Sequence, residues 1–188
     1  MSGNVVDVEV KEEDKRIQLV RSSFSSYPDF PKPGILFHDI FAVFSNPIAL
    51  EALFSLAKDY AESLKDDVDV IVGLDSRGFL LGPIMANHIQ KPFVPARKKG
   101  KLPGKCVSVS YSLEYGDDQL QMQESSMKRA DRVLIVDDLL ATGGTMKAAV
   151  DLVKKCGGEV VSTWVVVELA DLKGRPKIQA KVESLLQM

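Results

Sequence analysis

The sequence predicts a layered α/β domain built on a parallel sheet, and three apolar runs support that prediction. Residues 133–136 read Val-Leu-Ile-Val, a run without a polar face, as expected for a strand buried on both sides. Residues 68–74 form a second apolar run and residues 160–167 a third. Segments with helical spacing separate these runs, and strands that alternate with helices pair in parallel.

The N-terminal part of the chain predicts a tail, two helices and a turn-rich connection. We expect residues 1–10 to be a loose tail and residues 11–24 to form a short helix. Residues 25–34 hold three prolines and a glycine, which indicates turns. Asn46 followed by Pro47 is typical of a helix start, because Asn caps the first turn and Pro suits the first helical position.

The middle and C-terminal parts continue the alternation of helices and strands. Residues 78–89 read as a helix and residues 93–96 as a strand. A further helix is expected over residues 144–156, and the glycines at 157–158 end it. Residues 97–132 break the pattern because they are rich in Lys, Gly and polar side chains. We interpret them as an excursion from the core that forms a mobile hairpin.

Composition and charge indicate one cytoplasmic domain over residues 1–188. This length suits a single domain, and a hydrophobic fraction of 45% is enough for a core. Cys106 and Cys156 are far apart and fit no metal-binding spacing, so they are interpreted as reduced thiols. The net charge of −2 disfavours nucleic-acid binding. No apolar run approaches the ~18 residues needed to cross a membrane.

The most informative motif is VLIVDDLLATGGT, residues 133–145. The buried strand is followed by Asp137 and Asp138, and then by a loop of small residues that opens a helix. Ligands of parallel sheets bind at the carboxyl ends of the strands, so these carboxylates should share a crevice with Asp75. Glycines let backbone N–H groups approach an anion, and the helix N-terminus is positive. The loop predicted to hold a phosphate consists of Ala141, Thr142, Gly143, Gly144 and Thr145.

The two carboxylates of this motif suit a sugar. Ionised carboxylates only accept hydrogen bonds, which matches the donors of two adjacent hydroxyls. A phosphate loop beside them predicts a ribose 5-phosphate site. The alternative is a strand, an Asp-rich turn and a glycine-containing helix start without a ligand. The motif is not a Walker loop, because the Gly-Lys-Ser/Thr ending is missing.

The same thirteen residues resemble the phosphoribosyl pyrophosphate (PRPP) signature of the type I phosphoribosyltransferases. The resemblance implies a parallel-sheet core with a small N-terminal hood, here residues 25–45, and a flexible lid hairpin within residues 97–132. It also implies that Asp137 and Asp138 hold the ribose hydroxyls and that residues 141–145 hold the 5-phosphate.

Further segments resemble the adenine branch of this family. They are FPKPGILFHDI (30–40), GLDSRGFLLGP (73–83), RKKGKLPG (97–104), YSLEYG (111–116) and VELADLKGR (167–175). With the PRPP signature, the resemblance covers most of residues 25–175. It implies an enzyme of purine salvage that transfers the phosphoribosyl group of PRPP to N9 of adenine, which gives AMP and pyrophosphate.

The resemblance assigns the pyrophosphate to two regions. Ser76 and Arg77 follow a strand and precede a helix, and an Arg side chain can donate in a fork to phosphate oxygens. In the family, basic lid residues contact pyrophosphate and some reach the neighbouring subunit's site, which implies a homodimer. This role is carried over to Arg97, Lys98 and Lys101. The alternatives for this cluster are a solvated loop or a nuclear-localisation-like run.

The catalytic residue and the adenine contacts also follow from the resemblance. Glu114 is expected at N7 of the purine, where a proton or hydrogen bond offsets the electron density lost as N9 attacks. Tyr115 is expected to help cover the pyrophosphate. Phe37 would stack on the base and Leu169 would pack on its other face, although both could equally be plain core. The family often has Arg at the position of His38. The residues expected at the adenine are Leu36, Phe37, His38 and Leu169.

The expected cofactor is Mg²⁺, bound mainly through oxygens of PRPP or pyrophosphate and water, so no protein ligand of the metal is named. The expected partners are adenine, PRPP, AMP and pyrophosphate, without nucleic acid or membrane. Two alternatives remain at this point: a transferase for another purine base, or a non-catalytic PRPP-binding regulator. Such a regulator would need a DNA-binding module, and no basic recognition helix stands out before Pro31.

Overall fold

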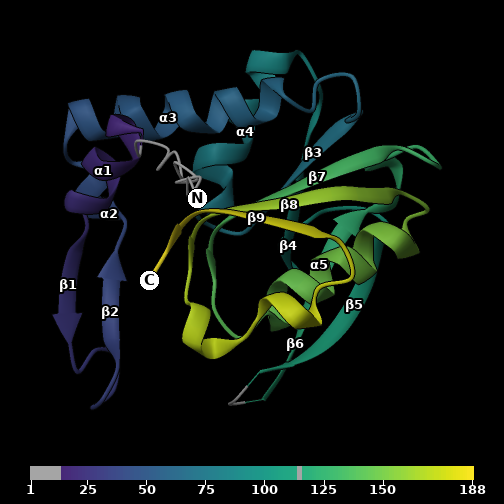
Figure 1. The fold of residues 1–188 in the computed structure, drawn as a ribbon. Coiled ribbons are helices and arrows are strands. Elements are labelled where there is room, and N and C mark those ends of the chain that lie inside the picture. The colour runs from purple at the N-terminus through teal and green to yellow at the C-terminus, as the bar shows by residue number, and fades with distance from the viewer. Residues whose placement is uncertain (1–13, 114–115) are drawn as a thin grey trace, which may run out of the picture. The chain divides into compact units, whose positions relative to one another are not determined.

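The computed structural model describes residues 14–113 and 116–188, without the side chains of the four residues that flank the gap. It divides the chain into two compact units, residues 1–53 and 54–188, each of which is drawn in Figure 1. The tail expected at residues 1–10 lies outside the described part, and the treatment of the whole chain as one domain stays a prediction.

The described part of the first unit, from residue 14 onward, contains two short helices and a two-stranded hairpin. Helix α1 spans Lys15–Ser22 and α2 spans Phe41–Phe44. Strands β1 (Ser25–Pro28) and β2 (Leu36–Asp39) pair antiparallel. The sequence predicted only turns around β1, because both strands are largely exposed or half-buried and carry no run of buried apolar residues.

Helix α3 spans Pro47–Glu62 and crosses the boundary between the two units. It begins at the predicted residue. Oδ1 of Asn46 accepts hydrogen bonds from the backbone N–H groups of Ile48 (3.1 Å) and Ala49 (3.3 Å). Because the first turn of a helix lacks intrahelical acceptors, this side chain satisfies two otherwise unpaired donors. The predicted capping of this helix is therefore confirmed.

The second unit is built on a seven-stranded sheet in the order β5-β6-β4-β3-β7-β8-β9. The strands are β3 (Val70–Leu74), β4 (Phe93–Lys98), β5 (Cys106–Leu113), β6 (Gly116–Gln123), β7 (Arg132–Leu140), β8 (Glu159–Glu168) and β9 (Lys181–Gln187). Five strands pair in parallel, and the antiparallel β5–β6 hairpin extends the sheet beside β4. The predicted α/β class with a parallel core is confirmed.

Helices cover both faces of this sheet (Figure 1). Helix α5 (Gly144–Lys155) packs on the face that carries Val70 and Val72, which share one core cluster with Met146 and Val150 of the helix. Alternate strand residues point to the opposite face, where α4 (Gly78–Ile89) contacts β3 and β7. Since both faces are covered, every residue of β3 is buried, which explains its uninterrupted apolar run.

Glycines let α4 approach the sheet closely. A Cβ atom on Gly82 would lie 2.5 Å from Cε2 of Phe93, and one on Gly73 would lie 2.6 Å from the same atom. A Cβ atom on Gly78 would overlap the backbone oxygen of Val136. The start of α4 therefore has room only for glycine, and the close approach places the loop at residues 75–77 beside β7.

Two features of the sheet differ from the expectation. Strand β7 does not end at the two aspartates but continues to Leu140, because Asp137 and Leu139 still pair with β8. The hairpin within residues 97–132 is part of the sheet: β6 pairs with β4, and Leu120 and Met122 are buried. In the described part of the chain, no helix is long and apolar enough to cross a bilayer.

The C-terminal region adds elements that the sequence did not predict. Among the described residues, the 3₁₀ turns are η1 (Glu124–Ser126), which follows β6, and the more C-terminal η2 (Ala170–Leu172) and η3 (Arg175–Lys177). The last two lead from β8 to β9, which forms the edge of the sheet opposite the hairpin. Only two apolar residues of β9, Val182 and Leu186, are buried, so its hydrophobic pattern is weak.

Candidate active site

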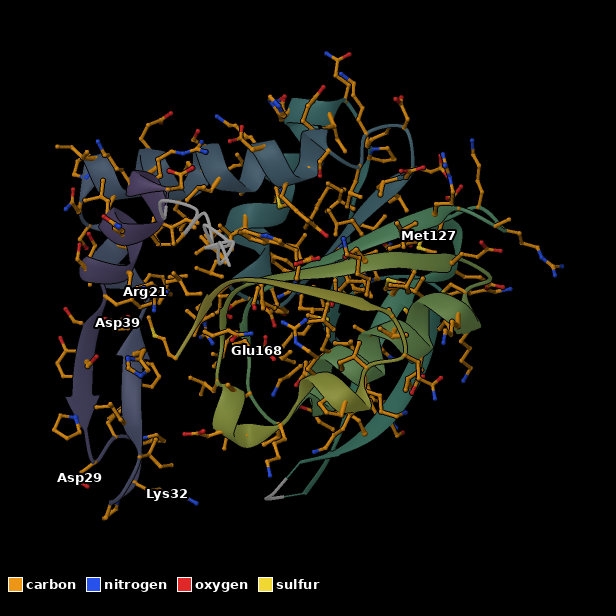
Figure 2. All side chains as sticks on the ribbon, in the orientation of Figure 1. Arg21, Asp29, Lys32, Asp39, Met127 and Glu168 are labelled. Carbon is orange, nitrogen blue, oxygen red and sulfur yellow. The ribbon has the colours of Figure 1, made fainter. Side chains whose placement is uncertain are left out.

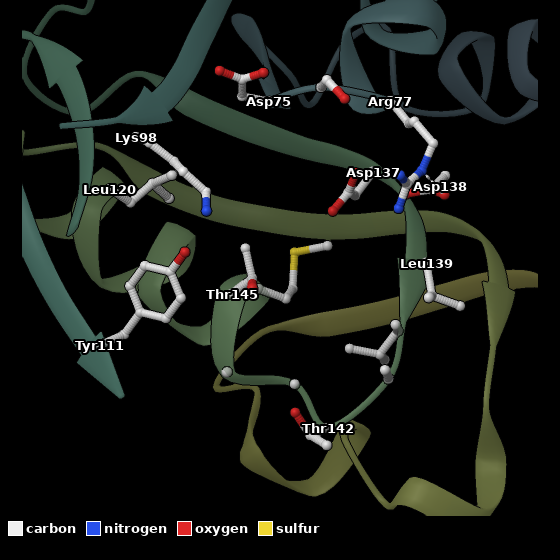
Figure 3. Close-up of a pocket in the computed structure, with 16 residues that line it drawn as sticks. Asp75, Arg77, Lys98, Tyr111, Leu120, Asp137, Asp138, Leu139, Thr142 and Thr145 are labelled. Carbon is white, nitrogen blue, oxygen red and sulfur yellow. Dashed lines mark hydrogen bonds and ion pairs between the residues drawn. The ribbon is translucent and has the colours of Figure 1, made fainter. Parts of the chain in front are cut away.

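A cavity of about 300 Å³ lies in the second unit, where β3 and β7 end (Figure 3). This is the position at which parallel α/β sheets bind their ligands. Lys98 and Tyr111 lie on one side of it, and Arg77 and Asp138 on the other. The cavity brings together these predicted residues: Ser76, Arg77, Lys98, Asp137, Asp138, Ala141, Thr142, Gly143, Gly144 and Thr145.

Residues 141–145 form the connection from β7 to α5. Gly143 has a φ of +83°, in the left-handed region that glycine adopts without strain. Its carbonyl accepts the hydrogen bond of Lys147 N–H at 2.9 Å, which begins the helix. The N–H groups of the first turn have no intrahelical acceptors, and the helix dipole makes this end positive. The loop can therefore bind an anionic phosphate through backbone donors.

The two aspartates differ in their surroundings. Asp138 is 7% exposed, and Nε of Arg77 donates a hydrogen bond to its Oδ2. Burial raises the pKa of Asp137 well above its usual range, and the negative charge of Asp138 raises this pKa further. An ionised Asp137 would be a strong acceptor for a hydroxyl group, so a ligand that donates hydrogen bonds here would stabilise the charged form.

Arg77 joins two predicted subsites. It was expected to contact pyrophosphate, and the structure pairs it with Asp138, which was expected to hold the ribose. A guanidinium carries several N–H donors, and a carboxylate has two oxygens. Arg77 can therefore keep its contact with Asp138 while it donates to a phosphate oxygen.

The basic residues of β4 and the following loop take different positions. Nζ of Lys98 lies 2.8 Å from Oδ2 of Asp118, and this contact raises the pKa of Lys98 and lowers that of Asp118. Nε of Arg97 donates to Oδ2 of Asp75 at 2.8 Å, and its Nη1 donates to the carbonyl of Lys101 at 3.2 Å. Lys98 lines the cavity, whereas Arg97 reaches it only through Asp75, which does line it.

Tyr111 lines the cavity although the sequence reasoning gave it no role. Its side chain is hydrogen-bonded to that of Thr145, and burial raises the pKa of its hydroxyl group. Tyr111 belongs to β5, where Val107, Val109 and Tyr111 pack in alternation against the core. This period of two in a segment already expected to form a hairpin was the signal that could have identified it.

The residues predicted at the adenine are not among those that line this cavity. Leu36, Phe37 and His38 belong to β2 of the first unit, where Nδ1 of His38 lies 2.9 Å from Oγ of Ser26. Phe37 packs edge-to-face on Phe30, with 5.1 Å between ring centroids.

Leu169 follows β8, and its N–H donates to the carbonyl of Leu140 at 2.9 Å. Glu114 and Tyr115 lie outside the described residues. The catalytic and adenine-binding assignments therefore stay predictions.

Comparison with known proteins gives one consistent result. Residues 41–187 match the model of the phosphoribosyl transferase domain. The chain is 48% identical to the adenine phosphoribosyltransferase of Drosophila pseudoobscura pseudoobscura, over 95% of this chain and 98% of that protein.

Two solved structures illustrate the similarity in fold. The adenine phosphoribosyltransferase of Saccharomyces cerevisiae, in complex with an imino-altritol bisphosphate and adenine, has a TM-score of 0.87 and 41% identity. That match covers 92% of this chain and 99% of the yeast chain. The enzyme of Trypanosoma brucei, in complex with AMP, pyrophosphate and ribose-5-phosphate, has a TM-score of 0.84 and 27% identity, with coverage of 95% and 82%.

Proposed function

The chain belongs to the adenine branch of the phosphoribosyl transferase family, and from this premise we propose how its cavity performs the reaction. The enzyme transfers the 5-phosphoribosyl group of PRPP to N9 of adenine, which forms AMP and releases pyrophosphate. One observation carries the proposal: a single cavity combines an amide-rich loop, two adjacent carboxylates and two basic side chains.

The ribose 5-phosphate half of PRPP binds at the end of β7. Residues 141–145 hold the 5-phosphate through backbone N–H groups and threonine hydroxyls, supported by the positive end of α5. Asp137 and Asp138 accept hydrogen bonds from the two ribose hydroxyls. This end of the substrate does not react, so its binding fixes C1 of the sugar for attack.

The pyrophosphate half binds on the opposite side of the two aspartates from the loop. Ser76, Arg77 and Lys98 supply donors and positive charge, and Arg97 and Lys101 flank them.

Within residues 14–113 and 116–188, no group of three or more His, Cys, Asp or Glu side chains could hold a metal ion. Mg²⁺ usually keeps several waters and binds substrate phosphates, so it would be held mainly through oxygens of PRPP or pyrophosphate and would neutralise charge on the leaving group.

The chemical step needs a group that assists the base. As N9 bonds to C1, the purine loses electron density, and Glu114 offsets this loss by a proton or hydrogen bond at N7. Tyr115 and the hairpin cover the pyrophosphate and exclude water, which would otherwise hydrolyse the activated sugar. The base itself is held by Leu36, Phe37, His38 and Leu169.

An assay with PRPP, Mg²⁺ and a panel of purine bases tests this function. We expect AMP from adenine, and little product from hypoxanthine, guanine or xanthine. Equal or faster turnover of another base would contradict the assignment to adenine. The comparison is informative because His38 stands where the family often has Arg.

A pair of variants tests the role of Glu114. Glu114→Ala should lower kcat by about 100-fold or more, the usual size of a lost general acid or base, and leave PRPP affinity nearly unchanged. Glu124→Ala removes an exposed carboxylate in η1, directly after the hairpin, and serves as the matched control. Unchanged kcat in Glu114→Ala would remove Glu114 from the mechanism.

The assembly and location of the enzyme are part of the same proposal. We expect a homodimer in which basic residues of β4 and the following loop reach the neighbouring site. Analytical ultracentrifugation should then give twice the mass of the chain. Both cysteines are free, which suits a reducing cytoplasm. A monomer with full activity would contradict the shared site.

A further inference from the structure

The segment between η2 and η3 lies directly against the phosphate loop. A Cβ atom on Gly143 would lie 2.6 Å from the carbonyl oxygen of Gly174. A Cβ atom on Gly174 would in turn overlap the carbonyl oxygen of Ala141. The two backbones are therefore in contact at two glycines, and neither segment can shift toward the other. The position of Gly174 thus limits the conformations that residues 141–143 can adopt.

Arg175, the next residue, donates hydrogen bonds to the last residue of β8 and to a residue near the start of β9. Its Nε donates to Oε1 of Glu168 at 2.9 Å, its Nη2 donates to Oε2 of the same carboxylate, and its Nη1 donates to the carbonyl of Val182 at 2.5 Å. Glu168 is the last residue of β8 (Figure 2). Its exposed fraction is only 5%. Ser184 of β9 donates to Oε2 of Glu168 at 2.9 Å. The turn is thereby fixed to the sheet rather than left as a free loop.

Lys177 provides a second connection to the phosphate loop. Its Nζ donates to the carbonyl oxygen of Thr142 at 2.8 Å. In a trans peptide the C=O and the following N–H point in opposite directions. Lys177 therefore turns the N–H of Gly143 away from itself, and both Thr142 and Gly143 line the cavity.

We propose that Glu168, Arg175 and Lys177 are positioning residues for the 5-phosphate. The buried Glu168 holds Arg175, Arg175 holds Gly174 against the loop, and Lys177 fixes the orientation of the Thr142–Gly143 peptide. The backbone donors are thus set before the substrate arrives, so their ordering does not reduce its affinity. This inference rests on the proposed function, since it assigns the loop to the substrate's phosphate.

The competing explanation is that this cluster only stabilises the joint between β8 and β9. That explanation predicts loss of stability without a selective effect on phosphate. A matched control exists in the pair formed by Asp69 and Arg132, in which Nη2 of Arg132 donates to Oδ1 of Asp69 at 3.0 Å. This pair lies where β3 and β7 begin, at the opposite end of the strands from the cavity.

Direct binding of ribose 5-phosphate to the full chain tests the proposal by calorimetry, with Glu168→Gln, Lys177→Met, Lys177→Arg and Asp69→Asn. Glu168→Gln and Lys177→Met should weaken binding by about 2- to 12-fold, the effect of losing one hydrogen bond. Lys177→Arg, which keeps a donor, should bind more tightly than Lys177→Met. Asp69→Asn should bind like the wild type even where its unfolding midpoint is lower.

Kinetics provide the second measurement. In Lys177→Met, an exposed substitution that does not threaten folding, KM for PRPP should rise while KM for adenine and kcat stay within about twofold, because uniform binding alone is affected. Unchanged ribose 5-phosphate affinity in both variants, or an equal loss in Asp69→Asn, would overturn the inference. Absence of AMP synthesis by the wild type would refute the proposed function instead, and the calorimetry would still decide the role of the cluster.

Discussion

Replacing Asp137 by Asn should stabilise the protein and weaken its binding of nucleotide. Burial and the charge of Asp138 raise the pKa of Asp137, so the ionised carboxylate is less favourable in the folded than in the unfolded chain. For a carboxyl group with a raised folded pKa, stability is fully present below the unfolded pKa of 3.8 and is lost as the pH rises through the folded value. The amide side chain of the Asp137→Asn variant carries no charge and avoids that loss.

The binding effect has the opposite sign. A hydrogen bond from a hydroxyl to a charged acceptor contributes about 1.5–3 kcal/mol, whereas one to a neutral acceptor contributes about 1 kcal/mol. The amide oxygen of Asn keeps one neutral acceptor. The difference of about 0.5–2 kcal/mol corresponds to an AMP affinity that is roughly 2- to 30-fold weaker.

Two titrations measure both effects on the same variant. Urea unfolding should give Asp137→Asn and wild type similar midpoints near about pH 3, and a higher midpoint for the variant at about pH 8. Calorimetry at about pH 8 should show weaker AMP binding by the variant than by the wild type. Asp66→Asn, at an exposed carboxylate outside the cavity, controls for loss of a negative charge. A variant that is less stable than wild type at the higher pH, or that binds AMP equally well, would refute the reasoning.

Three further substitutions test individual contacts. In the wild type, Arg132 lowers the pKa of Asp69 from 3.8 to about 2. The stability that this pair contributes is present above pH 3.8 and is lost as the pH falls through about 2. The urea midpoints of Asp69→Asn and wild type should therefore differ at neutral pH and converge in acid. Asn46→Ala removes the helix cap and should lower the free energy of unfolding in urea by about 1 kcal/mol, whereas Asn46→Asp should keep most of the wild-type stability. Gly78→Ala places a methyl group against the carbonyl of Val136 and should cost about 1–3 kcal/mol; a thermal midpoint equal to wild type would show that α4 can move away.

The sequence predicted the centre of the second unit well because burial on both faces leaves a local signal. All residues of β3 are buried, and the start and end of α4 at Gly78 and Ile89 agree with the helical pattern. The β1–β2 hairpin was missed because its side chains are exposed or half-buried. Strand β9 was missed for a related reason, since an edge strand with few buried residues has little periodicity.

The site could be predicted only where its residues are neighbours in the chain. The loop at 141–145 and the adjacent aspartates occupy one motif, and the structure places them around one cavity. The pairing of Arg77 with Asp138 joins residues 61 positions apart, and no local pattern reveals such a contact. Glu168 and Arg175 both belong to the segment 167–175 that resembles the family, but the hydrogen bonds of these two residues depend on how β8 and β9 align.

The order of strands in the sheet determines when a binding-competent cavity can exist during refolding. Strands β3 and β7 lie side by side, yet Asp69 and Arg132, the residues that join at their beginning, are 63 positions apart in the chain. Closing such a long loop costs entropy, and distant pairings form slowly. The β5–β6 hairpin lies between them in sequence, pairs locally and ends at the outer edge of the sheet. Recovery of AMP binding after dilution from urea should therefore lag behind hairpin formation and follow the joining of β3 to β7.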